Sequence, residues 1–262
     1  MRPYAAILSA RFRMLLQYRA AAAAGLSTQF FWGLIRMMIF QAFYENATGE
    51  LPMSGSQVTS YVWLGQAFLM LIPFRADREL IQMIRTGNVA YEMLRPVDLY
   101  WFWYARAIAD RVAPTLLRSV PLLIVATLAG WIHWPAPPTL AAFATLMAGA
   151  VLLGAAIWVL MSITMFWTIA GDGLSGLLAG AMFLLSGMIV PLPLFPDWAQ
   201  PVLNALPFRG LCDVPYRLFA GNIPLADLAG LLAHQLAWVT ALVLFSRWLL
   251  SHAARRLVVQ GG

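Results

Sequence analysis

Few side chains in this sequence could carry out chemistry, and the basic ones are all arginines. Among 262 residues the chain has seventeen basic side chains, none of them lysine, and eleven acidic ones. A Walker A phosphate loop and a pyridoxal Schiff base each need a lysine, so both are excluded and no cofactor is expected in this chain. The histidines, His133, His234 and His252, lack the spacing of metal ligands, and the single Cys212 cannot form an intrachain disulfide.

The densest group of charged side chains lies between Arg75 and Arg111. The stretch RADRELIQMIRTGNVAYEMLRP predicts two short helices, separated at Gly87 and ended by Pro96. A simple connector needs only about six residues, so the length favours a docking element for a cytoplasmic partner over a solvated loop. The aromatic run that follows, LYWFWYAR, is typical of a helix at the level of lipid headgroups. The candidate docking residues are Asp77, Arg78, Glu79, Arg85, Gly87 and Glu92.

The elements that carry these residues are predicted membrane spans. Hydrophobic residues make up 61% of the chain and charged residues 11%, against about 25% charged residues in soluble domains. Several windows of about eighteen or more apolar residues are long enough to cross a bilayer. The sequence therefore predicts an all-α integral membrane protein with a single transmembrane domain of six spans. The spans are expected at 22–43, 58–74, 112–132, 139–170, 174–190 and 225–250.

A basic segment precedes the first span. Its apolar side chains recur at intervals of three and four, which predicts an amphipathic helix over 1–21. Such a helix lies in the membrane interface, and a plain cytoplasmic lead-in is the simpler alternative. The stripe consists of Tyr4, Ile7, Leu8, Phe12, Leu15 and Leu16.

The arginines also predict the orientation of the spans. Fourteen of them fall in the N-terminal segment, in the segment 75–118 and near the C-terminus, which six spans place on one side of the membrane. The positive-inside rule makes that side cytoplasmic, with both termini there. Segments 44–57, 133–138 and 191–224 are then external, and 251–262 is a cytoplasmic tail. Arginine as the only basic residue, together with abundant alanine, favours a bacterial source and hence the bacterial cytoplasmic membrane.

Arg36 lies inside the first predicted span, where a charge is a functional candidate by default. Its side chain either faces a translocation path or extends outward toward Glu45 or Glu50. The other polar side chains that could line a path are weakly polar, which suits a lipid-like or amphiphilic substrate better than an inorganic ion. They are Gln41, Gln66, Ser162 and Thr164.

The turn IAGDGLSG precedes the fifth predicted span. Asp172 can cap that helix, and a second contact with the cytoplasmic partner is the alternative role. Gly176 and Gly180 form a GxxxG pair, which lets a neighbouring helix approach closely. The neighbour is either another helix of this chain or a helix of a second chain.

The segment 191–224 is predicted to form a lid at the outer end of the bundle. Pro191 and Pro193 are expected to stop the fifth helix, because proline removes a backbone donor and clashes with the preceding turn. Two short amphipathic pieces follow, and they are expected to lie on the external surface or to re-enter shallowly. The apolar face of the first piece, which Pro207 ends, is formed by Trp198, Val202, Leu203 and Leu206.

Taken together, this pattern resembles the permease subunits of ABC-2-type exporters. The passage at the outer end of the fifth span carries part of the resemblance, and the segments RTGNVAYEMLRPVDLY and RRLVVQGG resemble a narrower branch of short permeases. That branch usually pairs two different permeases with one kind of ATPase. The residues of the first passage are Ser186, Gly187, Pro191, Pro196, Trp198, Leu206 and Pro207.

The resemblance implies half of a transporter. Two permeases, either two different chains or two copies, would form the path, and two cytoplasmic ATPase subunits would bind ATP and Mg²⁺. The segment around Asp77 to Glu92 would be the main coupling element, and the turn at Gly171 to Gly173 a second one. Spans one, two and five would line the path, and the lid would close its exit. Membrane lipid surrounds the chain, and no nucleic-acid partner is expected.

Other classes fit the sequence less well. A secondary transporter needs ionisable coupling groups at mid-membrane, whereas the acidic residues outside the polar segment fall at helix ends or in loops. A membrane-embedded enzyme needs clustered acids, histidines or a nucleophile motif, and none is evident. A membrane anchor subunit that is not coupled to ATP remains an alternative.

Overall fold

The protein folds as a bundle of helices. The computed structural model describes residues 2–17, 19–74, 76–167 and 172–253, and these ranges contain helices and turns but no strand. The long helices are α1 (Arg2–Leu15), α2 (Arg19–Asn46), α3 (Gly55–Ala67), α6 (Leu99–Leu128), α7 (Pro137–Thr164), α8 (Asp172–Leu185) and α11 (Leu228–Ala253). The short ones are α4 (Arg78–Arg85), α5 (Val89–Met93), α9 (Gln200–Ala205) and α10 (Asp213–Phe219).

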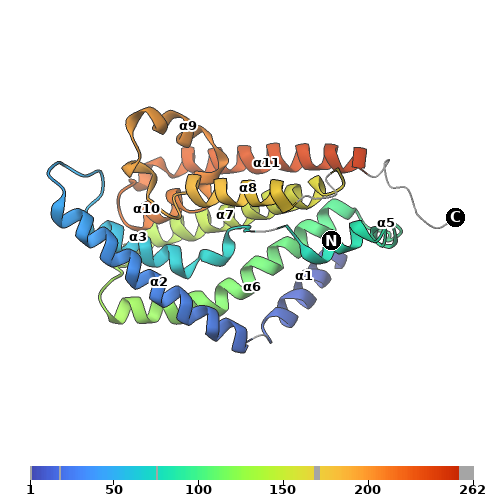
Figure 1. Ribbon diagram of the computed structural model, residues 1–262, viewed down its shortest axis with the longest axis horizontal. Coiled ribbons are helices and arrows are strands. Elements are labelled where there is room, and N and C mark those ends of the chain that lie inside the picture. The colour runs from blue at the N-terminus through green and yellow to red at the C-terminus, as the bar shows by residue number, and fades with distance from the viewer. Residues whose placement is uncertain (1, 18, 75, 168–171, 254–262) are drawn as a thin grey trace.

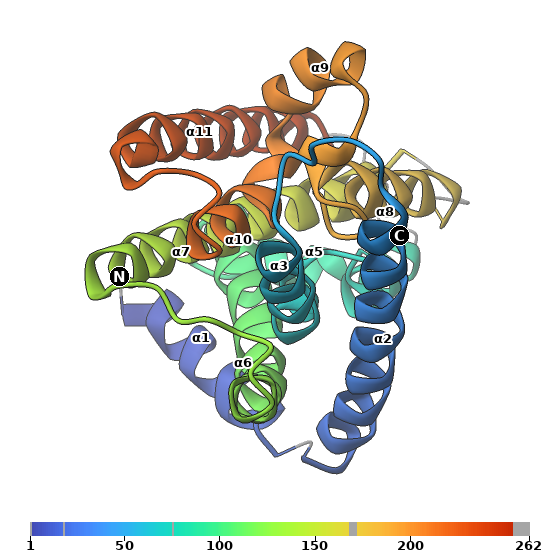
Figure 2. The ribbon, with the colours of Figure 1, turned by 90° about the vertical axis from the view of Figure 1, so that its left-hand side faces the viewer.

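The two ends of the bundle differ. One end carries the loop between α2 and α3 together with α9 and α10, and the other carries α5 (Figure 1). Seen from the first of these ends, α3 lies in the middle, with α2 along one edge and α11 along another (Figure 2). Helices α6, α10 and α11 pack on α7, and α1 packs along α6.

The surface is that of a membrane protein. Three of the described segments are long and apolar enough to cross a bilayer, namely 99–128, 137–164 and 225–253. Large apolar side chains also point outward in rows along three helices, which a soluble monomer rarely tolerates. These rows include Phe31, Trp32, Met38 and Ile39 on α2, Leu116, Val120 and Ile124 on α6, and Leu244, Phe245 and Trp248 on α11. The all-helical prediction is confirmed, and the chain is a multi-pass membrane protein.

Helix α7 forms the core of the bundle. It is apolar on every side, and most of its residues are buried. Gln235 of α11 is buried against it and donates from Nε2 to the carbonyl oxygens of Leu146 (3.1 Å) and Gly210 (2.8 Å). A Cβ atom at Gly149 would overlap the amide end of the Gln235 side chain, so a larger residue there would displace Gln235 from this position.

The predicted second span, 58–74, is only partly helical. Helix α3 ends at Ala67, a 3-10 turn covers Leu69–Leu71, and Ile72 is extended at φ −73° and ψ 129°. Pro73 disfavours helical backbone at the preceding residue, which accounts for Ile72. The 13 residues of α3 span roughly 20 Å, less than the ~30 Å hydrocarbon core. The prediction of one continuous helical span here is therefore wrong.

The fourth and fifth predicted spans also end early. The sequence predicted helix from 139 to 170, whereas helix α7 ends at Thr164 and a turn follows. Residues 168–170 lie outside the described ranges. Helix α8 ends at Leu185, before Pro191 and Pro193 are reached, so the prediction that these prolines stop it is wrong. The chain turns instead at Gly187, whose φ of +82° favours glycine.

The third predicted span begins earlier than expected. Helix α6 starts at Leu99, so the aromatic run and Arg111 belong to the same helix as the predicted span. Tyr100 and Trp103 are almost fully buried and pack in a cluster with Trp158 of α7. The apolar stripe of α1 also packs on protein, since Tyr4 and Ile7 join the same cluster.

The first and sixth predicted spans agree best with the structure. Helix α2 covers 19–46 against a predicted 22–43. Helix α11 covers 228–253 against a predicted 225–250, and a 3-10 turn at Leu225–Asp227 precedes it. The terminal motif RRLVVQGG lies outside the described residues.

Candidate functional site

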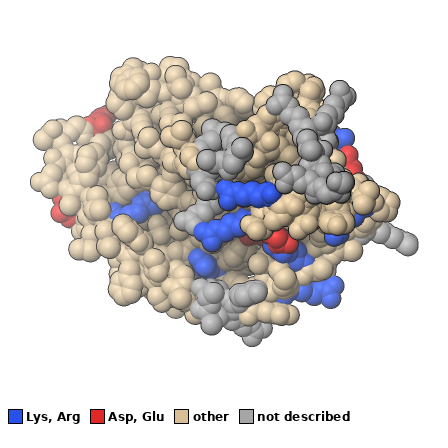
Figure 3. All heavy atoms as spheres, turned by 45° about the vertical axis from the view of Figure 1, so that its right-hand side comes forward, with Lys and Arg blue, Asp and Glu red and all other residues tan. Residues whose placement is uncertain are grey.

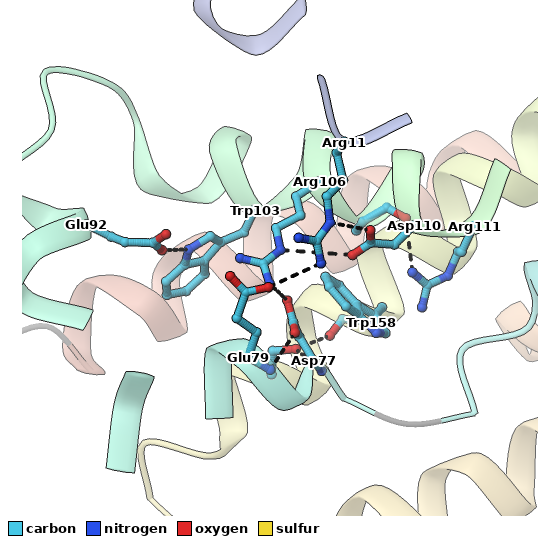
Figure 4. Close-up of polar contacts among 11 residues, drawn as sticks. Arg11, Asp77, Glu79, Glu92, Trp103, Arg106, Asp110, Arg111 and Trp158 are labelled. Carbon is cyan, nitrogen blue, oxygen red and sulfur yellow. Dashed lines mark hydrogen bonds and ion pairs between the residues drawn. The ribbon is translucent and has the colours of Figure 1, made fainter. Parts of the chain in front are cut away.

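A buried network of charges anchors the polar segment after α3 (Figure 4). Arg106 of α6 pairs through Nη2 with Asp77 Oδ2 at 2.7 Å and with Glu79 Oε2 at 2.6 Å. Arg11 of α1 pairs with Asp110 Oδ1 at 2.8 Å and with the same Glu79 oxygen at 3.2 Å. Two arginines therefore bridge three acids and hold α1, α4 and α6 together. We call these five residues the ion network.

Asp77 has a second role at the start of α4. Its side chain caps the helix by accepting from the backbone N–H of Glu79 at 2.9 Å, and its own N–H donates to Ser162 Oγ of α7 at 3.3 Å. Burial raises the pKa of the Asp77 carboxyl, and the charge of Arg106 acts against this rise. Asp77 thus joins α4, α6 and α7 at one point.

The second short helix, α5, is also tied to α6. Glu92 is buried and accepts a hydrogen bond from Trp103 Nε1 at 2.7 Å. Asp98 caps α6 through the N–H of Trp101 and pairs with Arg247 of α11 at 3.0 Å. The predicted break between the two short helices is confirmed, because α4 ends at Arg85 and Gly87 has a φ of +75°.

The outer face of α4 and α5 is exposed. Arg78 and Arg85 lie at this surface, and charged atoms gather on the half of the molecule that carries these helices (Figure 3). Tyr91 and Leu94 are 72% and 80% exposed, and Met93 lies between them. Large apolar side chains on a charged segment are characteristic of an interaction surface. We call Arg78, Tyr91, Met93 and Leu94 the α5 surface.

The structure divides the predicted docking residues into two groups. Asp77 and Glu92 are buried and form hydrogen bonds or ion pairs within the chain, whereas Arg78 and Arg85 are exposed. Glu79 lies between these groups, because it joins the ion network while its side chain is 56% exposed. Sequence analysis missed Arg11, Arg106 and Asp110 as partners. The i, i+4 spacing of Arg106 and Asp110 was the available signal, and Arg106 Nε lies 3.9 Å from Asp110 Oδ2.

A cavity of about 790 Å³ lies between α2, α3 and the segment that follows α8. Most of its lining is apolar, including Trp32, Phe40, Leu69 and Phe183. Arg36 lines it too and donates from Nη2 to the carbonyl oxygen of Ile189 at 2.6 Å. The expectation that Arg36 extends outward to Glu45 or Glu50 is therefore wrong.

Two glutamines complete the polar part of the cavity. Gln66 of α3 accepts from Arg36 Nη1 at 3.2 Å and donates to the backbone oxygen of Gln29 at 3.2 Å, in the amide orientation that satisfies both atoms. The side chain of Gln29 is 3% exposed and lines the cavity, and neither of its polar atoms has a partner within the described residues. The cavity thus has apolar walls and one polar corner.

A comparison with family models decides what these features belong to. The model described as ABC-2 family transporter protein matches residues 30–261, from α2 to the C-terminus. This chain belongs to the ABC-2 transporter family. Among curated proteins, none matches the chain.

Within this ABC-2 transporter chain, residues 196–206 of the predicted lid segment are mostly exposed, whereas residues 207–220 are mostly buried. Helix α10 packs on α7 and α3, and Asp213 at its start is 1% exposed. Asp213 Oδ1 accepts from the N–H of Leu192 at 2.9 Å and lies 3.2 Å from the hydroxyl of Tyr61, while Oδ2 pairs with Arg217 at 3.2 Å. Asp213 therefore connects the segment to α3.

The predicted lid residues of the ABC-2 chain lie in different surroundings. Pro191 and Pro207 are buried, whereas Pro196 and Trp198 are exposed, Trp198 at 81%. The expected single apolar face on α9 is divided, because Leu203 is buried against Leu192 while Val202 points outward.

Helix α8 presents an open face. Gly176 and Gly180 are exposed, and a Cβ atom at either would meet nothing within 4 Å among the described residues. Close packing of this GxxxG pair against another described helix of the ABC-2 chain is therefore absent. Asp172 begins α8, but its side chain, like Gly171, lies outside the described part of the structure.

Proposed function

We propose that this chain is the permease subunit of an ATP-driven ABC exporter and forms half of its translocation path. A separate cytoplasmic ATPase, present in two copies, binds ATP and Mg²⁺ and supplies the energy. The observation that carries the proposal is the α5 surface: exposed apolar side chains on a charged segment that the rest of the chain holds rigidly. Family membership supports a partner ATPase in general.

The proposed topology has six membrane-crossing segments in the bacterial cytoplasmic membrane, with both termini in the cytoplasm. The α4–α5 end is cytoplasmic, and the end with α9 and α10 is external. The arginines near α4 and α5 support this orientation by the positive-inside rule. Short α3 and α8 cross only with the help of the non-helical segments that continue them, which lie against other helices where their backbone groups find partners.

The ion network gives the proposed coupling a physical basis. Separating α4 from α6 would break a buried pair between Arg106 and Asp77, and this is unfavourable wherever either charge stays buried without its partner. A force applied to α4 and α5 therefore moves α6 and α1 with them. Closure of the ATPase dimer would shift a two-state helix bundle between inward-facing and outward-facing forms.

The open face of α8 fits a second permease. Its glycines allow close approach of a helix, and Leu177 beside them is 75% exposed. We propose that a different permease chain, or a second copy, packs there. The cargo is an amphiphilic or lipid-like molecule, since the cavity beside α8 is mainly apolar.

Purification from the native membrane in mild detergent, followed by mass spectrometry, tests the proposal. An ATPase subunit in a ratio of about one to one is expected, with or without a second permease. If the chain is purified alone and the preparation shows no ATP hydrolysis, the result would instead favour a secondary transporter or an anchor subunit.

A pair of variants tests the docking surface. Replacing Tyr91 and Leu94 by alanine should reduce the recovered ATPase by roughly tenfold or more, because central apolar anchors dominate interface energies. Replacing Trp198 and Val202 by alanine is the matched control, since they are equally exposed at the opposite end. Equal ATPase recovery in both variants would show that docking does not use the α5 surface.

A further inference from the structure

The polar corner of the cavity between α2, α3 and the end of α8 carries an unbalanced positive charge. Among the residues that the structure describes, no carboxylate forms an ion pair with Arg36. Its guanidinium donates to the neutral oxygens of Ile189 and Gln66. A cation in apolar surroundings is costly unless an anion accompanies it.

Gln29 gives a second, independent indication of a missing ligand. Its side chain is buried in the same cavity with one donor and one acceptor unused. Buried amide groups nearly always have hydrogen-bond partners, and an unpaired one costs about 1–3 kcal/mol. Arg36 and Gln29 lie two turns apart on one face of α2, and both line the same cavity.

The remainder of the cavity suits an apolar tail. Its walls are side chains such as Phe40, Leu69 and Phe183, and its volume of about 790 Å³ lies in the range of sites for small organic ligands. Trp32, Ile39 and Phe43, which border it, are 50–61% exposed on the apolar face of α2. A ligand can therefore enter sideways from the lipid, where an inorganic anion would be insoluble.

We propose that this cavity binds an anionic amphiphile, with its negatively charged head group on Arg36 and Gln29 and its hydrocarbon tail among the aromatic and aliphatic walls. Head-group oxygens accept from the guanidinium and from the Gln29 amide, while a head-group hydroxyl donates to Gln29 Oε1. The identification of this molecule as cargo rests on the proposed export function, whereas the binding itself does not.

Binding to the purified chain tests the proposal with defined probes. Dodecyl phosphate and its neutral analogue dodecanol are titrated while tryptophan fluorescence and thermal unfolding are followed, in a neutral detergent. We expect dodecyl phosphate to bind at least roughly tenfold more tightly, since hydrogen bonds to charged groups contribute about 1.5–3 kcal/mol. Equal affinity for the two probes would overturn the proposal.

Three variants locate the site. Arg36→Met should remove the preference for the anion, Gln29→Leu should weaken binding of both probes, and Arg36→Lys should keep part of the anion preference. Arg209→Met is the matched control, because Arg209 lies outside the cavity and donates to Asn204 at 2.6 Å. Unchanged binding in Arg36→Met, or an equal loss in Arg209→Met, would contradict the proposal. If Arg36→Met fails to fold, the binding measured with Gln29→Leu and Arg36→Lys still tests the proposal.

Native mass spectrometry distinguishes the two sources of such a ligand. A phosphatidylglycerol that stays bound through purification, and is lost in Arg36→Met, would assign the cavity to resident lipid. Binding of dodecyl phosphate to a chain that carries no lipid would assign it to a diffusible amphiphile. Either result supports the anionic site, and neither depends on recovery of the ATPase, so the two proposals fail separately.

Discussion

Two regions of this protein place an arginine in opposite electrostatic surroundings. At the end with α4 and α5, Arg106 is 6% exposed and has carboxylates as partners. In the cavity beside α2, Arg36 contacts the neutral oxygens of Ile189 and Gln66, and no described carboxylate pairs with it. Both arginines lie on long helices among apolar neighbours, so the sequence around them looks alike. The difference lies in what each one contacts across the bundle.

This difference separates architecture from ligand binding. A paired and buried arginine fixes the relative positions of helices, because any movement exposes unpaired charges. An arginine without an anion contributes little to the fold and keeps its binding capacity for a molecule outside the chain. Replacing each of the two arginines by methionine tests this difference.

Arg106→Met should cause the largest effect. It leaves Asp77 buried without its cation, and loss of one partner of a buried pair destabilises proteins by about 3–5 kcal/mol. We expect a lower unfolding temperature in detergent and a reduced yield of folded protein. Tryptophan fluorescence during heating measures this.

A second substitution checks the cause. In the double variant Arg106→Met with Asp77→Asn, the stranded negative charge is removed, so part of the stability should return. A double variant as unstable as the single one would show that packing of the arginine stem, rather than the ion pair, explains the loss.

Arg36→Met should change the stability of the empty chain by less than about 1 kcal/mol. The lost hydrogen bond to Ile189 is offset by removal of a cation that no carboxylate balances. The same heating experiment measures it. A loss as large as that of Arg106→Met would mean that Arg36 is a structural residue, and the contrast between the two regions would disappear.

The contrast also shows what the sequence could reveal. Span positions near α2, α6 and α11 followed from long apolar runs, and the two short helices around Gly87 followed from local stop signals. These features depend on neighbouring residues along the chain. The end of α8 did not follow, because the turn after it depends on contacts with distant residues. At Gly187, for example, a Cβ atom would lie 2.4 Å from the Tyr61 hydroxyl oxygen, 126 positions away.

The roles of charged residues were harder to predict than the helices. Asp77, Arg78 and Glu79 are adjacent in sequence, yet Asp77 and Glu79 join the ion network of the described residues, whereas Arg78 does not and is exposed. Arg11 reaches Asp110 across 99 positions. Composition can show that a segment is charged, whereas the pairing partners become known only when the bundle is assembled.

Trp103→Phe should have an intermediate effect, confined to α5. The change removes the donor at 2.7 Å from Glu92 and leaves a buried carboxylate unpaired, at a cost of about 1–3 kcal/mol. Amide hydrogen exchange should become faster in Val89–Met93 and remain unchanged in α7. Glu92→Gln keeps an acceptor oxygen and should lose less. Faster exchange throughout the bundle would show that α5 is not an independent element.

Asp98→Asn should have the smallest effect on the stability of the protein. Asp98 pairs with Arg247 at 3.0 Å, but the two side chains are 37% and 41% exposed, and such surface pairs contribute about 0–1 kcal/mol. Asparagine still caps α6, since it can accept from the Trp101 N–H as aspartate does. The small difference from wild type should disappear when salt is raised from about 0.05 M to about 0.5 M, because the ions screen exposed charges over a few ångströms. A salt-independent loss as large as that of Arg106→Met would show that pairing rather than burial sets the importance of a charge in this chain.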